Sequence, residues 1–120
     1  MKFIQYVLPA AMLFATGLSR ADTVIAGAGG ETCEAWTKAR KVQNRQPKDA
    51  VADSMMISWV QGFLSSKNSN GATILDVPDV SVLRFYTDKV CGRTPEAKIF
   101  SIADDLADLL IEQYSEKKRK

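Results

Sequence analysis

Apolar residues recur at helical spacing between residues 49 and 66. They are three or four positions apart, which places them on one side of an α-helix: Met55, Met56, Trp59, Val60, Phe63 and Leu64. The pattern predicts a helix over 49–66 with the strongest apolar stripe in the chain. Gly62 lies inside it at a cost of about 1 kcal/mol relative to alanine, which favours close packing of a neighbouring segment there.

The same periodicity returns after Thr94-Pro95-Glu96. A capping residue, a proline and then an acid are typical of a helix start, so a helix is predicted from this point. Its outer face carries Asp104, Asp105 and Asp108. Its inner face carries Ile99, Ile102, Ala103, Leu106, Leu109, Leu110 and Tyr114.

Two further helices are predicted from their capping residues. One begins at Asp79, after Pro78, and ends near Cys91-Gly92. The other begins at Thr32, has Glu34 in its first turn and ends at Gln46-Pro47. Its apolar positions are Cys33, Trp36 and Val42, and its basic run is expected to be solvated: Lys38, Arg40, Lys41 and Arg45.

The segments between these helices carry turn-forming residues. Residues 67–71 predict a loop, and 73–77 an extended coil, because one short β-branched run cannot form a sheet. Residues 22–30 are small and glycine-rich, which predicts a flexible arm. The expected fold is an all-α, four-helix domain over residues 31–116, followed by a basic tail over 117–120.

The first 21 residues have the pattern of a secretory signal peptide. Lys2 precedes an apolar stretch, and Ser19 and Ala21 place small residues before a cleavage site. The stretch is shorter than the roughly 20 apolar residues of a membrane span and contains Pro9. We therefore expect cleavage after Ala21, a periplasmic location and no stable membrane insertion.

The two cysteines, Cys33 and Cys91, both follow the predicted cleavage site. In an exported chain such a pair is expected to form one disulfide, which adds about 4 kcal/mol of stability for a loop of this length. Their spacing differs from the Cys-x-x-Cys arrangement of redox-active pairs, so a structural bond is expected.

Charge is balanced in the predicted mature chain. Lys2 and Arg20 account for two of the 16 basic residues, so residues 22–120 hold 14 basic and 14 acidic side chains. Four of the basic residues end the chain, Lys117 to Lys120, and are expected to be solvated.

Candidate catalytic chemistry is sparse. The chain has no histidine, its cysteines are expected to pair, and Asp104 and Asp105 point about 100° apart on a helix. No phosphate-binding loop, EF-hand or aromatic–basic pattern occurs. We expect neither an enzyme nor bound metal, cofactor or nucleic acid.

The apolar stripe between residues 55 and 64 has two interpretations. Its side chains can form the core, or they can be partly exposed as a dimer face or client-binding surface, a role suited to flexible methionines. As a protein-binding candidate it comprises Met55, Met56, Trp59, Val60, Phe63 and Leu64. A homodimer is one assembly that this interpretation allows.

Several short motifs resemble the HdeA/HdeB group of small periplasmic acid-stress chaperones. These are Thr32-Cys33-Glu34 with Trp36, Gly62-Phe63-Leu64 leading to Lys67-Asn68, Leu75-Asp76-Val77, and Cys91 before the last helix. They occur in the family's order over residues 31–110. The resemblance implies a small helical fold with one disulfide, and a dimer that dissociates in acid, exposes apolar surface and holds unfolding clients.

A second function class fits the same features. Small exported helical proteins with disulfides also include immunity proteins of the Tai type and accessory proteins of secretion or conjugation systems. Such a protein would bind one specific partner at neutral pH, through the same apolar face or through the acidic outer side of the last helix. A chaperone would instead suppress aggregation of many clients in acid.

Overall fold

Four α-helices and one short 3-10 helix make up the chain in a computed structural model that describes residues 25–70 and 74–120. In order they are η1 (Gly27–Gly30), α1 (Cys33–Ala39), α2 (Pro47–Asn70), α3 (Val80–Cys91) and α4 (Ile99–Arg119). The all-α, four-helix prediction is confirmed. The predicted signal peptide, residues 1–21, lies outside the described residues.

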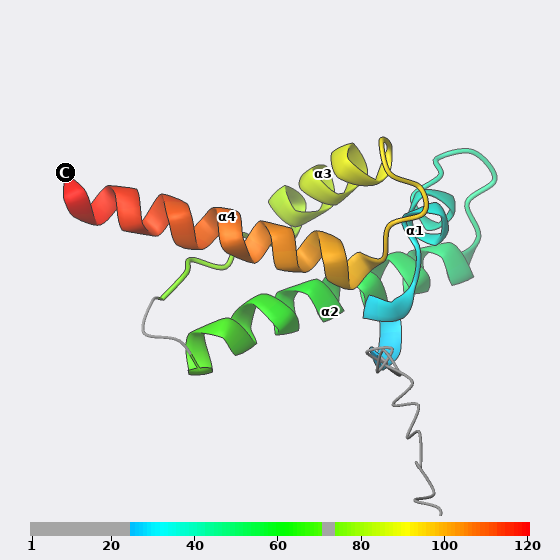
Figure 1. The fold of residues 1–120 in the computed structure, drawn as a ribbon. Helices are drawn as coiled ribbons and strands as arrows, with labels where there is room; N and C mark the ends of the chain where they lie inside the picture. Colours follow the sequence, from blue (N-terminus) through cyan, green and yellow to red (C-terminus); the bar gives the residue numbers. More distant parts are fainter. Residues whose placement is uncertain (1–24, 71–73) are drawn as a thin grey trace, which may run out of the picture.

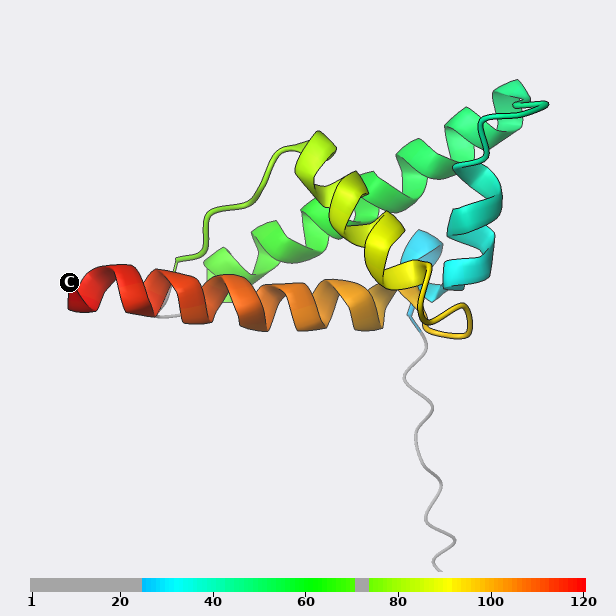
Figure 2. The same ribbon diagram turned by 90° about the horizontal axis from the view of Figure 1, so that it is seen from above.

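Helix α2 is the element on which the others pack, since α1, α3, α4 and η1 all contact it. Figure 2 shows α2 and α4 diverging, with α1 and α3 on the side where the two helices separate. The C-terminal turns of α4 extend beyond the other helices in both views (Figure 1, Figure 2). One side of α2 therefore faces the other helices, and the other side faces solvent.

The core lies where the inner sides of the helices meet. Most inward positions of α2, α3 and α4 are buried apolar side chains, as the periodicity predicts. Leu109, expected on the inner face of α4, is 42% exposed, and Asp53 and Thr87 are buried polar residues. The larger members of the core are Trp36, Met56, Ile57, Val60, Leu64, Leu75, Leu83, Ile99, Ile102 and Leu106.

The predicted disulfide is confirmed. Cys33, the first residue of α1, is bonded to Cys91, the last residue of α3, and both are buried. The bond closes a loop across 58 positions, for which chain entropy gives about 4 kcal/mol of stabilisation. It holds α1 against α3 independently of the packing around it.

The predicted capping residues of α1 and α3 are confirmed. Thr32 Oγ1 accepts a hydrogen bond from Ala35 N at 3.2 Å, and Asp79 Oδ1 accepts one from Val82 N at 3.2 Å. Each side chain satisfies a backbone donor that has no partner within its own helix.

Helix α1 ends at Ala39, so its predicted extension to residue 46 is wrong. The Arg45 side chain folds back and donates to Ala39 O at 2.9 Å, and Asn44 turns the chain with a φ of 54°. Val42, expected as an apolar helix position, is 90% exposed in the linker. The helix therefore ends where the linker folds back onto the carbonyl group of Ala39.

Helix α2 runs from Pro47 to Asn70, longer than the predicted 49–66. The predicted loop over 67–71 is helical through Asn70, and residue 71 is outside the described residues. Asn68 remains in the helix because its side chain pairs with the returning segment: it donates to Leu75 O and accepts from Leu75 N, at 3.0 and 2.8 Å. The predicted extended coil covered residues 73–77: residues 74–77 have no regular secondary structure, and residue 73 lies outside the described residues.

Helix α4 begins at Ile99, so the predicted start at Thr94-Pro95-Glu96 is wrong. These residues form a turn whose carbonyl groups serve another helix: Pro95 O accepts from Glu34 N at 3.0 Å, and Ala97 O from Cys33 N at 2.8 Å. The turn thus caps the N-terminus of α1. The basic tail is also not separate, since Lys117 to Arg119 form the last turn of α4.

The glycine-rich stretch is also more ordered than predicted. We expected residues 22–30 to form a flexible arm, but Gly27–Gly30 form η1, which packs against α2 and α4. Gly29 is buried beside Trp59. The prediction is wrong for residues 25–30, and residues 22–24 lie outside the described residues.

Candidate functional site

The six predicted binding residues lie on two different sides of α2. Met56, Val60 and Leu64 are 3%, 2% and 0% exposed and belong to the core. Met55 is 61% exposed, and Trp59 and Phe63 are partly buried. Because successive residues turn by about 100° around a helix, Met55 and Met56 point in different directions. The sequence therefore brought together two sets that the fold separates.

The outer face of α2 carries small and apolar side chains. We define it as Ala50, Val51, Ser54, Met55, Ser58 and Gly62, all of which are exposed. Between residues 50 and 66 the only charged residue is Asp53, which is buried. Exposed helix faces usually carry charged residues, so an uncharged face of this length is typical of a contact surface.

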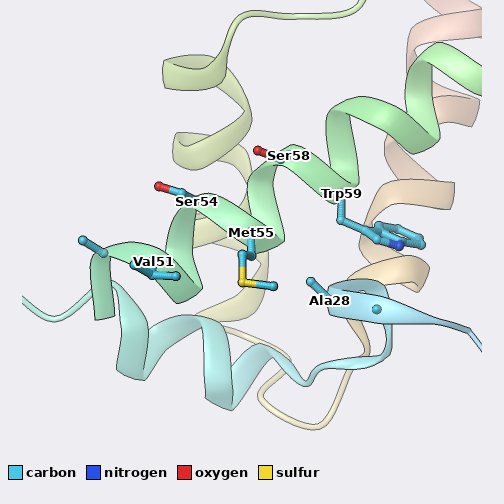
Figure 3. Close-up of a pocket in the computed structure, with 8 residues that line it drawn as sticks. Ala28, Val51, Ser54, Met55, Ser58 and Trp59 are labelled. Atoms are coloured by element: carbon cyan, nitrogen blue, oxygen red, sulfur yellow. The ribbon is translucent and has the colours of Figure 1, made fainter. Parts of the chain in front are cut away.

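An open groove of about 770 Å³ lies between the outer face of α2 and η1. Figure 3 shows Met55 and Trp59 extending from α2 towards Ala28 of η1, with Val51 further along the same side. A second hollow of about 510 Å³ adjoins it and is lined by Met55, Glu31 and Ala35 among others. Met55 lines both hollows and is the most central apolar side chain of the site.

Gly62 has open space where a side chain would be. A Cβ added there would meet nothing within 4 Å. The predicted close approach of a neighbouring segment at Gly62 is thus wrong for the described part of this chain. The missing side chain leaves a shallow point on the outer face of α2, and no other described segment packs into it.

Trp59 is positioned by two contacts. Its indole Nε1 donates to Ala26 O at 3.2 Å, and its ring stacks on Phe63 with centroids 5.4 Å apart. Lys67 Nζ lies 4.9 Å from the centroid of the Phe63 ring. The segment containing Ala26 thus covers part of an aromatic pair.

On the opposite side of α2, a buried carboxylate binds three arginines. The side chain of Asp53 is 2% exposed and accepts from Arg40 Nη1 at 3.0 Å, Arg45 Nη2 at 3.1 Å and Arg84 Nε at 2.9 Å. Arg40 follows α1, Arg45 lies in the linker and Arg84 belongs to α3. We call this set the Asp53 cluster, and it joins three parts of the chain to α2.

A second carboxylate, Asp88, completes the arrangement. It accepts from Arg40 Nε and Nη2 at 3.0 and 2.9 Å, a bidentate pair, and from Trp36 Nε1 at 2.8 Å. Hydrogen bonds to Asp88, opposed by burial and reinforced by Asp53, raise the pKa of Arg40, which stays charged. Arg40 therefore serves both acids at once.

The pKa of Asp53 lies below its ordinary value. Burial acts to raise this pKa, but the hydrogen bonds from Arg40, Arg84 and Arg45 outweigh it and favour the carboxylate. A group whose folded pKa is lowered stabilises the fold above its unfolded pKa, near 4, and that contribution is lost as the pH falls through the folded value.

Sequence reasoning missed the Asp53 cluster. Arg40 and Arg45 were expected to be solvated; Arg45 is exposed and Arg40 is partly buried, but both also bind Asp53, which the sequence did not predict. One signal was available: Asp53 shares a helical side with Ile57, Val60 and Leu64, and an acid on a core stripe requires a buried partner.

No grouping of three or more acidic or cysteine side chains in the described part of the chain could hold a metal ion. Among the same residues, no helix is both long enough and apolar enough to cross a membrane. Comparison with protein-family models, curated proteins and solved structures finds no match. The resemblance to the HdeA/HdeB group accordingly stays a prediction.

Proposed function

We propose that this chain is a periplasmic, acid-stress chaperone-like protein that opens in acid and holds unfolding polypeptides on the apolar sides of α2. The observation that carries the proposal is the Asp53 cluster, in which one buried carboxylate compensates three guanidinium groups. The proposal assigns no enzymatic step and no cofactor to the chain.

Acid acts directly on this cluster. Protonation of Asp53 leaves Arg40, Arg45 and Arg84 beside a neutral carboxyl. Breaking a fully buried ion pair costs about 3–5 kcal/mol, and the cost here is lower, because the guanidinium groups are about a third exposed and Arg40 keeps its pair with Asp88. At the same time the 14 acidic side chains of residues 22–120 lose their charge, which leaves 14 positive charges to repel one another. Both effects favour separation of the α1–α2 linker and α3 from α2.

Opening would make the apolar stripe of α2 continuous. Met56, Val60 and Leu64, now in the core, would join Met55 and Trp59 at the surface. The Cys33–Cys91 bond would keep α1 attached to α3, so the opened chain would remain compact enough to close again. A homodimer at neutral pH, expected from the resemblance, would bury a further apolar surface that dissociation in acid would expose.

The decisive experiment measures light scattering of an acid-denatured client enzyme at pH 2 and pH 7, with the disulfide-intact protein present or absent. We expect suppression of aggregation at pH 2 alone. The Asp53→Asn variant, which lacks the compensating charge at every pH, should suppress aggregation at a higher pH than the wild type. Asp104→Asn, which alters an exposed carboxylate that pairs with Lys67, is the matched control.

Two outcomes would contradict the proposal. Absence of suppression at both pH values would show that the protein has no chaperone activity towards this client. Suppression by the wild type at pH 7 as strong as at pH 2 would show that acid does not activate it. Circular dichroism of each variant at pH 7 separates loss of the fold from loss of the activity.

The outer face of α2 favours a second candidate, a binding protein for one specific partner at neutral pH, such as an immunity protein or a secretion or conjugation accessory protein. This face and its groove are accessible in the closed fold, so binding needs no opening. Recovery of one stoichiometric partner from an exported fraction at pH 7, lost in Met55→Asp and retained in Asp104→Asn, would support this candidate.

A further inference from the structure

The segment before α1 occupies a defined position on α2 and α4. Gly27–Gly30 contact both helices, and Ala26 O accepts the Trp59 indole hydrogen bond at 3.2 Å. Gly29 is buried against the ring: a Cβ at this position would overlap Cζ2 and Cε2 of Trp59. The contact therefore accepts a backbone and excludes a side chain at one specified residue.

The segment is held without ion pairs. Residues 25–30 are Ile-Ala-Gly-Ala-Gly-Gly, without a charged side chain or a cysteine. Ala28 packs against the core, and Glu31 O, directly after the segment, accepts a hydrogen bond from Ile99 N at 2.9 Å. Gly27 has a φ of +77°, a conformation that other residues rarely adopt. The segment is thus held as a short peptide would be, by the shape of its small residues and by backbone carbonyl groups.

We propose that Trp59 and the adjoining groove form a recognition site for short polypeptide segments of alternating small residues and glycine, and that Ala26–Gly29 is its resident intramolecular ligand. A partner segment of the same pattern would present a carbonyl group to Trp59 Nε1 and a glycine to the face of the ring. The groove beside it, lined by Val51 and Met55, would take an apolar side chain of the same partner.

This inference names the first contact of the proposed client binding, so its biological use rests on the proposed function. The site itself does not depend on acid or on the Asp53 cluster. A tethered segment has an effective concentration in the millimolar range, so it excludes a free peptide of equal affinity until it is displaced.

The test uses the full chain and a synthetic peptide with the sequence of residues 25–31. Gly29→Ala introduces a methyl group that overlaps Trp59 and should expel the resident segment. The control is Gly62→Ala, whose methyl group meets nothing within 4 Å. The two tryptophans supply the readout, because the indole N–H of Trp59 bonds Ala26 O and that of Trp36 bonds Asp88.

At pH 7 we expect the Trp59 indole N–H resonance to shift in Gly29→Ala and the Trp36 resonance to stay. Adding the peptide should return the Trp59 resonance towards its wild-type position, with at least about tenfold tighter binding to Gly29→Ala than to the wild type. A peptide carrying the Gly29→Ala change should not restore it. In Gly62→Ala both resonances should keep their wild-type positions.

An unchanged Trp59 resonance in Gly29→Ala, or no recovery with the peptide, would overturn the inference. Loss of the Trp36 resonance as well would indicate general unfolding. Gly27→Ala, which strains the backbone at φ +77° without overlapping the ring, is then the second variant and must show the same recovery. Because client scattering is not measured, failure here leaves the chaperone proposal standing, and the reverse also holds.

Discussion

The two longest helices of this protein expose very different faces. The outer side of α4, a helix of 21 residues, carries Asp104, Asp105, Asp108, Glu112 and Glu116, all exposed. The outer face of α2, a helix of 24 residues, carries no charged residue between positions 50 and 66. Both helices bury an apolar stripe, so the difference concerns only the side towards solvent.

This difference separates two uses of a helix. A charged outer side keeps α4 hydrated and needs no further explanation. The outer face of α2 leaves Val51 and Met55 beside an open groove, and the charge of α2 in this region is concentrated in one buried residue, Asp53. We therefore expect binding, and the local acid response of the Asp53 cluster, on α2, whereas the acidic residues of α4 contribute only to the general change in charge.

The largest expected effect concerns one aspartate on each helix. Asp53→Asn should lower the free energy of unfolding at pH 7 by about 2–3 kcal/mol, because Arg45 and Arg84 lose their compensating charge and Arg40 keeps only Asp88; partial exposure of the guanidinium groups holds the loss below that of a fully buried pair. Asp104→Asn should change it by less than about 0.5 kcal/mol. Urea unfolding checks both. As the pH falls through the folded pKa of Asp53, the difference between Asp53→Asn and the wild type should vanish; a constant difference would contradict the cluster's role.

A matched pair of leucines gives the next effect. Leu64→Ala, at a position on α2 that is 0% exposed, should cost about 2–3 kcal/mol through lost burial and a cavity. Leu109→Ala, at a 42% exposed position on α4, should cost less than about 1 kcal/mol. Thermal unfolding of the two variants is the measurement. Equal losses of stability would show that Leu109 is as deeply buried as Leu64, contrary to the structure.

Charge placed on the outer face of α2 should alter binding more than stability. Ser58→Glu should change the free energy of unfolding by less than about 0.5 kcal/mol, since Ser58 is exposed, yet weaken binding of a partner at pH 7, where the added carboxylate is charged, at the groove that Ser58 lines. Glu112→Ser on α4 is the reverse change and should leave binding intact. Equal effects of the two variants on binding would remove the distinction between the faces.

Gly62→Ala should give the smallest effect, and a favourable one. With nothing within 4 Å of the added methyl group, alanine should raise the free energy of unfolding by about 0.5–1 kcal/mol through its helix propensity. A loss of stability would show that another part of the protein, or a second copy, packs against Gly62 in solution. Unfolding in denaturant at two protein concentrations distinguishes cover by the same chain from cover by a second copy.

Helix boundaries illustrate where sequence reasoning was sufficient and where it was not. The starts of α1 and α3 were predictable because Thr32 and Asp79 bond backbone donors three residues away. The predicted start of α4 was wrong. Thr94-Pro95-Glu96 has the order of residues that is typical of a helix start, yet Pro95 O in this turn accepts a hydrogen bond from the N-terminus of α1. Local propensity cannot reveal that a turn is needed by a helix some 60 positions earlier.

The candidate site divides in the same way. The apolar stripe was visible in the sequence, but its assignment to core or surface was not, because Met55 and Met56 are equally apolar and differ only in direction. Sequence reasoning also could not show that Gly29, in a stretch without periodicity, lies against Trp59, 30 positions later. The sequence does not distinguish a glycine that is required because a side chain would clash, such as Gly29, from a glycine in a flexible segment.

The sequence by itself determined the helical class, the caps at Thr32 and Asp79, and the pair of cysteines available for a bond, because these depend on spacing along one segment and on composition. Only the tertiary structure decided which side of α2 meets solvent, that Asp53 gathers Arg40, Arg45 and Arg84, and that Ala26 covers Trp59. The physical reason is distance along the chain: these contacts join residues 8 to 33 positions apart, and their energy exists only once the helices have packed.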